Sequence, residues 1–144
     1  METMTIIFVS LGIFFLLHLI GDFIFQNRYL AINKSRSVKV LTYHVGLYIT
    51  PFIVLFPLLH PDLAWVKLMT FSNYLWFIGL LFVTHWITDF FTSKLTTYFY
   101  LKEKYKYFFD TIGVDQWIHT ITLLALYYYF ILPYILKATL FIAH

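Results

Sequence analysis

Three histidine–aspartate pairs lie within the apolar stretches of this sequence. The two residues of each pair are four positions apart, and the pairs are His18/Asp22, His85/Asp89 and Asp115/His119. On a helix this spacing places both side chains on one face, one turn apart. Ionisable groups are costly inside a bilayer and by default mark a functional site. The three pairs therefore predict one buried polar site.

The donor types of this site favour a metal centre. His44 adds a fourth imidazole, and the chain has no cysteine. Imidazole and carboxylate ligands without thiolate suit Zn, Mn or Fe, and there are enough donors for two divalent ions. The residues that we expect to be ligands are His18, Asp22, His85, Asp89, Asp115 and His119. We expect His44 to be an additional ligand or the general base of a reaction.

Three further polar side chains are candidates for contacts with the ligands or with a substrate: Gln26, Lys94 and Gln116. Lys94 lies about one turn beyond Asp89, and we expect it to pair with that carboxylate. A purely structural alternative stays open, in which the His–Asp pairs join helices by hydrogen bonds and bind no metal. Small residues or hydroxyl groups join helices at lower cost, so the metal interpretation is favoured.

The rest of the sequence predicts an all-α, polytopic membrane protein. Hydrophobic residues make up 61% of the 144 residues, and charged residues 12%, against about 25% in soluble domains. Apolar runs long enough to cross a bilayer lie at about 4–26, 38–59, 70–98 and 110–141. Prolines at 51, 57 and 133 predict kinks or helix ends. We expect residues 1–144 to form a single transmembrane domain.

Basic residues are concentrated in two of the connectors between these spans. The connector after the first span contains Arg28, Lys34, Arg36 and Lys39, and the one after the third contains Lys102, Lys104 and Lys106. The middle connector offers Asp62 and Lys67. The positive-inside rule then places the first and third connectors in the cytoplasm and both termini outside. All seven candidate histidines and aspartates fall within roughly 10–15 Å of depth near the cytoplasmic face, at 1.5 Å rise per residue.

The sequence also contains a possible internal duplication. The pattern His-x-x-x-Asp-Phe occurs at 18–23 and again at 85–90, each time near the inner end of a span. Each copy is followed by a basic connector and a returning span with an inward histidine, His44 or His119. This predicts two duplicated helical hairpins related by a pseudo-two-fold axis along the membrane normal.

With these residues in view, the chain resembles domain-of-unknown-function family 3307, a family of small bacterial integral membrane proteins. The resemblance rests on His18 to Phe23 with Gln26, on Lys34 and His44, on His85 to Phe90, and on Asp115, Gln116 and His119. It implies a multi-pass protein of the bacterial inner membrane and brings no settled activity. The chain is more loosely similar to membrane-bound metal-dependent hydrolases with histidine–aspartate motifs in their spans.

Three functions from different classes fit these features. The first is a metal-dependent hydrolase of a phosphorylated or lipid-like substrate, because a bound metal activates water and the basic connectors attract anionic head groups. The second is a divalent-cation or proton transporter or channel, which with four spans requires a homo-oligomer. The third is a structural anchor or assembly partner in the lipid bilayer. We expect no binding of nucleic acid.

Overall fold

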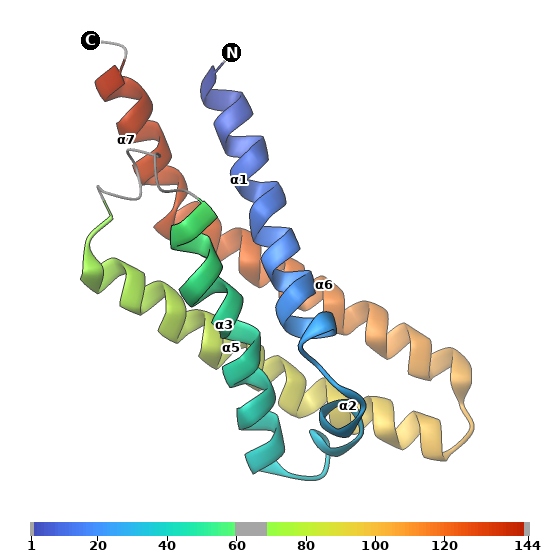
Figure 1. Ribbon diagram of the computed structural model, residues 1–144. Coiled ribbons are helices and arrows are strands. Elements are labelled where there is room, and N and C mark those ends of the chain that lie inside the picture. The colour runs from blue at the N-terminus through green and yellow to red at the C-terminus, as the bar shows by residue number, and fades with distance from the viewer. Residues whose placement is uncertain (1, 60–68, 143–144) are drawn as a thin grey trace.

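The computed structural model describes residues 2–59 and 69–142, and every regular element within them is helical (Figure 1). The connector at 60–68, which contains Asp62 and Lys67, lies outside the described residues. The elements are α1 (Glu2–Leu19), the π-helical turn η1 (Ile20–Ile24), α2 (Arg28–Asn33), α3 (Val38–Leu59), α5 (Phe71–Leu101), α6 (Tyr105–Phe130) and α7 (Leu132–Ile142).

The four predicted membrane spans are confirmed. Four segments are long and apolar enough to cross a membrane: Thr3–Ile24, Val38–Leu55, Phe71–Leu101 and Tyr105–Leu140. The first helix begins and the last one ends at the same end of the molecule (Figure 1). The described part of the chain is therefore an all-α membrane protein with four candidate spans.

The third and fourth spans are longer than the apolar runs predict, because α5 and α6 form a continuous hairpin. The turn between them is only three residues long, and Glu103 adopts a left-handed conformation there with φ of 56°. Aromatic side chains pair across the hairpin: Phe99 stacks on Tyr107 with ring centroids 5.4 Å apart, and Tyr100 contacts Phe108 at 5.6 Å. These pairs extend both helices beyond the predicted spans.

Two of the helices are interrupted. The first span ends in η1, where the Phe25 amide donates to the Ile20 carbonyl at 2.9 Å, five residues back. The fourth span changes direction between α6 and α7, as predicted for Pro133, which lacks an N–H donor and whose ring would clash with the Tyr129 carbonyl in a continuous helix (Figure 1). By contrast, α3 continues through Pro51 and Pro57, so the helix ends at neither position, and kinks there stay a prediction.

The core divides into an aromatic half and a polar half. In the aromatic half, Phe14 of α1 contacts the rings of Phe52, Phe77 and Tyr127 with centroids 5.2–5.8 Å apart. These four residues are at most 4% exposed. Towards the α5–α6 turn this apolar packing gives way to the histidines and aspartates. The polar site thus lies at one end of a closely packed bundle.

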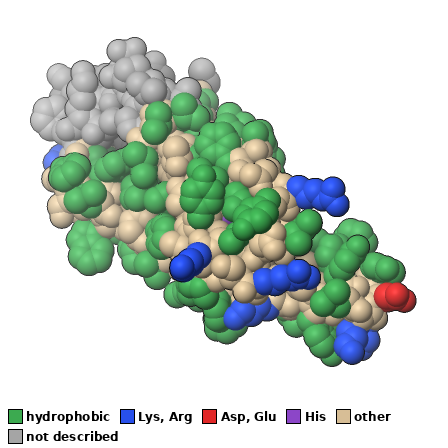
Figure 2. All heavy atoms as spheres, turned by 60° about the horizontal axis from the view of Figure 1, so that its bottom comes forward, with side chains coloured by type: hydrophobic (Ala, Val, Ile, Leu, Met, Phe, Trp, Pro, Cys, Tyr) green, Lys and Arg blue, Asp and Glu red, His purple; other side chains and the backbone are tan. Residues whose placement is uncertain are grey.

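The outer surface of the molecule is mostly apolar. Figure 2 views the end that carries α2 and the hairpin, and hydrophobic side chains cover much of it with Lys and Arg between them. Large side chains such as Phe8, Trp76 and Trp117 are more than 60% exposed, which suits contact with lipid. Threonine hydroxyls within α5 donate to carbonyls of their own helix four residues back, which satisfies them in apolar surroundings.

Candidate functional site

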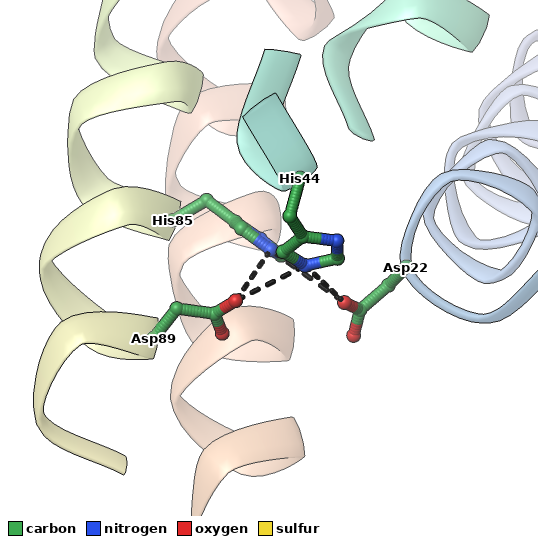
Figure 3. Close-up of side chains that lie close together, drawn as sticks. All are labelled: Asp22, His44, His85 and Asp89. Atoms are coloured by element: carbon green, nitrogen blue, oxygen red, sulfur yellow. Dashed lines mark ion pairs between the residues drawn. The ribbon is translucent and has the colours of Figure 1, made fainter. Parts of the chain in front are cut away.

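Four buried side chains from three elements point toward a common centre (Figure 3). Asp22 comes from η1, His44 from α3, and His85 and Asp89 from α5. His44 Nε2 lies 3.3 Å from Asp22 Oδ1 and 3.1 Å from Asp89 Oδ2. His85 Nε2 lies 3.6 Å and 3.7 Å from the same two oxygens. None of the four residues is more than 3% exposed.

We name this group the four-donor set, and its spacing fits a tetrahedral metal ion. Metal–ligand distances of about 2.0–2.2 Å give ligand–ligand separations of about 3.3–3.6 Å around a tetrahedron. The four nitrogen–oxygen separations in the set are 3.1–3.7 Å. Asp22 Oδ1 and His85 Nε2 are fully buried and make no hydrogen bond with the described residues. Buried polar atoms are expected to have a partner. The set therefore has the spacing of a metal-ligand shell, and these two atoms are free to bind an ion.

The π-helical turn places Asp22 in this set. Such turns occur often at functional sites. Here Gly21 brings the turn against the backbone of α3, where an added Cβ would meet the Tyr48 carbonyl oxygen at 2.5 Å. The glycine is required by this close approach of two backbones. The following residue, Asp22, can therefore reach His44 on the facing helix.

Stacking fixes the ring of His85. The Tyr48 ring stacks on the His85 ring with centroids 3.7 Å apart, and the His119 ring stacks on the His85 ring at 4.0 Å. Within the described residues, Nδ1 of His85 has no hydrogen-bond partner. Ring packing therefore takes the orienting role that a second hydrogen bond plays in many metal sites.

A second group of donors adjoins the first through a shared carboxylate. Asp22, Asp115 and His119 also offer ligand atoms within 4.8 Å of one another. His119 Nε2 lies 3.4 Å from Asp115 Oδ1 and 3.2 Å from Asp89 Oδ1. Gln116 donates through Nε2 to Asp22 Oδ2 at 2.9 Å and to Asp115 Oδ2 at 3.1 Å. The amide thus already joins the carboxylates of this group, and in the four-donor set His44 Nε2 lies between the two carboxylates.

The structure brings six of the seven predicted histidines and aspartates into these two groups, and His18 is the exception. Its Nδ1 lies 3.1 Å from the Tyr48 hydroxyl and its Nε2 lies 3.3 Å from Gln116 Oε1. His18 therefore orients Gln116 from beside the donors. Its role as a ligand stays a prediction.

The predicted pairing of Lys94 with Asp89 is wrong. Lys94 Nζ lies 3.4 Å from the centre of the Phe90 ring. Five residues correspond to about 140° around a helix, so Lys94 and Asp89 do not share a face.

Lys34 is the basic residue that reaches the site, and the sequence interpretation assigned it only to a connector. Its ammonium donates to Asp89 Oδ2 at 2.9 Å and lies 3.5 Å from His44 Nε2. Burial lowers the pKa of Lys34, but the charges of Asp89 and Asp22 raise it more, so the net pKa lies above its ordinary value. The ammonium therefore stays charged within the cluster.

Two hydroxyl groups in the site were also missed. The Thr92 hydroxyl oxygen lies 2.5 Å from Asp115 Oδ1, and the Tyr48 hydroxyl contacts His18. The signal for Thr92 was present in the sequence, because it stands seven residues after His85 on the same face of the helix. Tyr48 likewise stands four residues after His44.

A cavity of about 490 Å³ adjoins the cluster. Asp22, Asp115 and Gln116 form part of its wall, together with Lys34 and the predicted polar residue Gln26. The Oε1 atom of Gln26 is buried there without a hydrogen-bond partner in the described residues. The remaining wall comes mainly from α2, α5 and α6 and combines hydroxyl groups and Arg36 with apolar side chains. A small molecule can thus approach the carboxylates from one side.

Comparison with known proteins gives a family and no activity. No curated protein and no solved structure matches the chain. One family model, described as "Protein of unknown function (DUF3307)", matches residues 10–143. The matched region contains every side chain of the two donor groups. The chain therefore belongs to the DUF3307 family.

Proposed function

We propose that the four-donor set holds a divalent metal ion and that the protein is a metal-dependent hydrolase of the membrane. The observation that carries this proposal is a buried set of two imidazoles and two carboxylates with tetrahedral spacing, beside a cavity. Zn is favoured, with Mn or Fe as alternatives, because only nitrogen and oxygen donors are present. A second ion at Asp22, Asp115 and His119 would give a two-metal site with Asp22 as the bridge.

Charge balance supports this proposal. In their ionised forms, Asp22, Asp89 and Asp115 place three negative charges in the site, and Lys34 contributes one positive charge. Uncompensated charges are very costly in an apolar interior. One divalent cation would neutralise the two negative charges that remain.

The residues around the metal position have roles that suit hydrolysis. When bound, the ion supplies a polarised water that acts as a nucleophile near neutral pH. Lys34 lines the cavity with a positive charge that suits an anionic substrate such as a phosphoester. Gln116, held by His18 and both neighbouring carboxylates, orients Asp22 and Asp115. On the other side of the site, the aromatic half fills the bundle, which favours chemistry reached from one face over transport through the molecule.

We place the site near the cytoplasmic face of a bacterial inner membrane, with both termini outside. The support is the charge pattern, because the connector that holds Lys34 and the α5–α6 turn are both basic and lie at the end of the bundle with the site. An anionic head group would be attracted to the same end.

The test is the metal content of the purified protein. We expect at least one divalent ion per chain after dialysis at neutral pH, and at least tenfold less in the His85→Ala/Asp89→Ala variant. A matched control is Asp110→Ala, which removes an exposed carboxylate outside both donor groups and should retain the metal. Parent protein without stoichiometric metal would overturn the proposal. Metal-loaded protein that releases no phosphate from alkyl phosphates would overturn the phosphoesterase form of it.

A further inference from the structure

The cavity beside the metal position has two chemically distinct parts. On α5 its wall runs from Thr92 to Leu101, and on α6 from Phe108 to Gln116. At 1.5 Å rise per residue, nine residues of α5 correspond to about 13 Å. Polar groups line the part next to the cluster, and aromatic and aliphatic groups line the part next to the helical turn. The cavity is therefore amphipathic along its length.

The polar part offers groups with no partner of their own. Arg36 lines the cavity, and within the described residues its guanidinium makes no hydrogen bond or ion pair. Ser93 is 8% exposed, and its hydroxyl has no partner there either. This differs from Thr92 and Thr96 on the same helix, which donate to backbone carbonyls. An unpaired guanidinium and a buried free hydroxyl suit the oxygens of a phosphate group.

The apolar part suits a hydrocarbon chain. Its wall is formed by Ile32 of α2, Leu101 of α5, and Phe108 and Ile112 of α6. Exposed aromatic residues surround this end of the hairpin: Tyr98, Tyr100, Tyr105 and Tyr107 are all more than 50% exposed. Tyrosine is favoured at the interface between lipid and water, so lipid molecules have access to this end.

We propose that the cavity binds a single-chain amphiphile with a terminal phosphate. Arg36 and Ser93 hold the phosphate beside the metal position, and the chain lies along Leu101, Phe108 and Ile112. This assignment names the substrate class of the hydrolase proposed above and rests on that proposal. Cavities of about 300–1,000 Å³ hold small-molecule ligands, so this volume suits a phosphate with one chain better than a phospholipid with two.

Binding of dodecylphosphonate tests the assignment, because its carbon–phosphorus bond resists hydrolysis. The protein in neutral-detergent micelles, treated with a chelator, is titrated and followed by phosphorus NMR. We expect saturable binding of one molecule per chain, and about tenfold weaker binding in Arg36→Gln. The matched control is Lys39→Gln, which removes a nearby exposed positive charge outside the cavity and should bind as the parent does.

Two comparison ligands separate the sources of affinity. Methylphosphonate carries the same head group without the chain and should bind at least 100-fold more weakly, because each buried methylene contributes to affinity. Ile112→Trp should favour octylphosphonate over dodecylphosphonate by narrowing the apolar part. Equal weakening by Arg36→Gln and Lys39→Gln, or equal binding of methylphosphonate, would overturn the assignment.

Metal content, measured on the same preparations before the chelator is added, separates this assignment from the proposed function. Arg36→Gln should keep its metal, because Arg36 is outside both donor groups. Phosphonate binding by a parent protein that contains no metal as purified would overturn the hydrolase and its substrate assignment, and would leave a lipid-phosphate binding site. A metal-loaded protein that binds no dodecylphosphonate would overturn the substrate assignment alone.

Discussion

Asp89→Asn should lower the free energy of unfolding of the metal-free protein by about 3–5 kcal/mol, the range for breaking a buried ion pair from one side. Asp89 Oδ2 accepts from Lys34 at 2.9 Å, and Oδ1 lies 3.2 Å from His119 Nε2. The Asp89 side chain is 1% exposed and that of Lys34 is 14% exposed. Asparagine keeps the shape but removes the charge, and its amide turns a donor toward Lys34 or His119. Unfolding by SDS in mixed micelles with a chelator, followed by circular dichroism, measures the change.

The partner variant shows whether the loss comes from the uncompensated lysine. Lys34→Met removes the ammonium and keeps most of the aliphatic stem, so the double variant Lys34→Met/Asp89→Asn should recover part of the stability. A double variant that is less stable than Asp89→Asn would contradict this explanation.

The chain contains a matched exposed pair. Lys106 and Asp110 also approach to 2.9 Å, but their side chains are 81% and 55% exposed. Solvent screens such a pair, so Asp110→Asn should leave the unfolding midpoint unchanged. Similar unfolding midpoints for Asp89→Asn and Asp110→Asn would show that the buried pair of Lys34 and Asp89 stabilises the protein no more than the exposed pair does.

The fold could be predicted from the sequence because the bilayer imposes strong local rules. The second span was placed at the bounds that α3 has, and the first and third lie within a few residues of theirs. Five of the six histidines and aspartates in the two donor groups are predicted by pairs four residues apart, which share a helix face. That rule acts within one helix, so it required no knowledge of how the helices pack. The relation of the two hairpins by a two-fold axis stays a prediction.

The missed features depend on contacts between distant parts of the chain. Lys34 reaches Asp89 because the connector folds back over the bundle, where α2 begins at the Asn27 cap and Ser35 meets Thr97 at 2.9 Å. Basic residues in a connector are expected from the positive-inside rule alone. The sequence of the connector therefore does not show which of its lysines is buried and which are solvated. The π-helical turn was missed for the same reason, because its cause is the approach of Gly21 to Tyr48.

Gly21→Ala should destabilise the protein by about 1–3 kcal/mol, the usual cost of overpacking a well-packed site, and should lower its metal content. The added methyl carbon would lie 2.5 Å from the carbonyl oxygen of Tyr48 and 3.1 Å from the Cα atom of Tyr48. Both are backbone atoms, so relief requires movement of η1 away from α3. That movement would draw Asp22 away from His44, now at 3.3 Å, and would strain the contact between His18 and Tyr48. Unfolding in mixed micelles and elemental analysis measure the two effects.

Gly12→Ala is the control for this substitution, because Gly12 lies on the same span and has nothing within 4 Å of its added Cβ. Alanine is favoured over glycine in a helix by about 1 kcal/mol, so this variant should be neutral or more stable and keep its metal. The same chemical change is thus expected to have opposite signs at two positions of one span. If Gly21→Ala gained stability as Gly12→Ala does, the close approach of η1 and α3 would be wrong. Asp22 would then lose the contact that places it in the four-donor set.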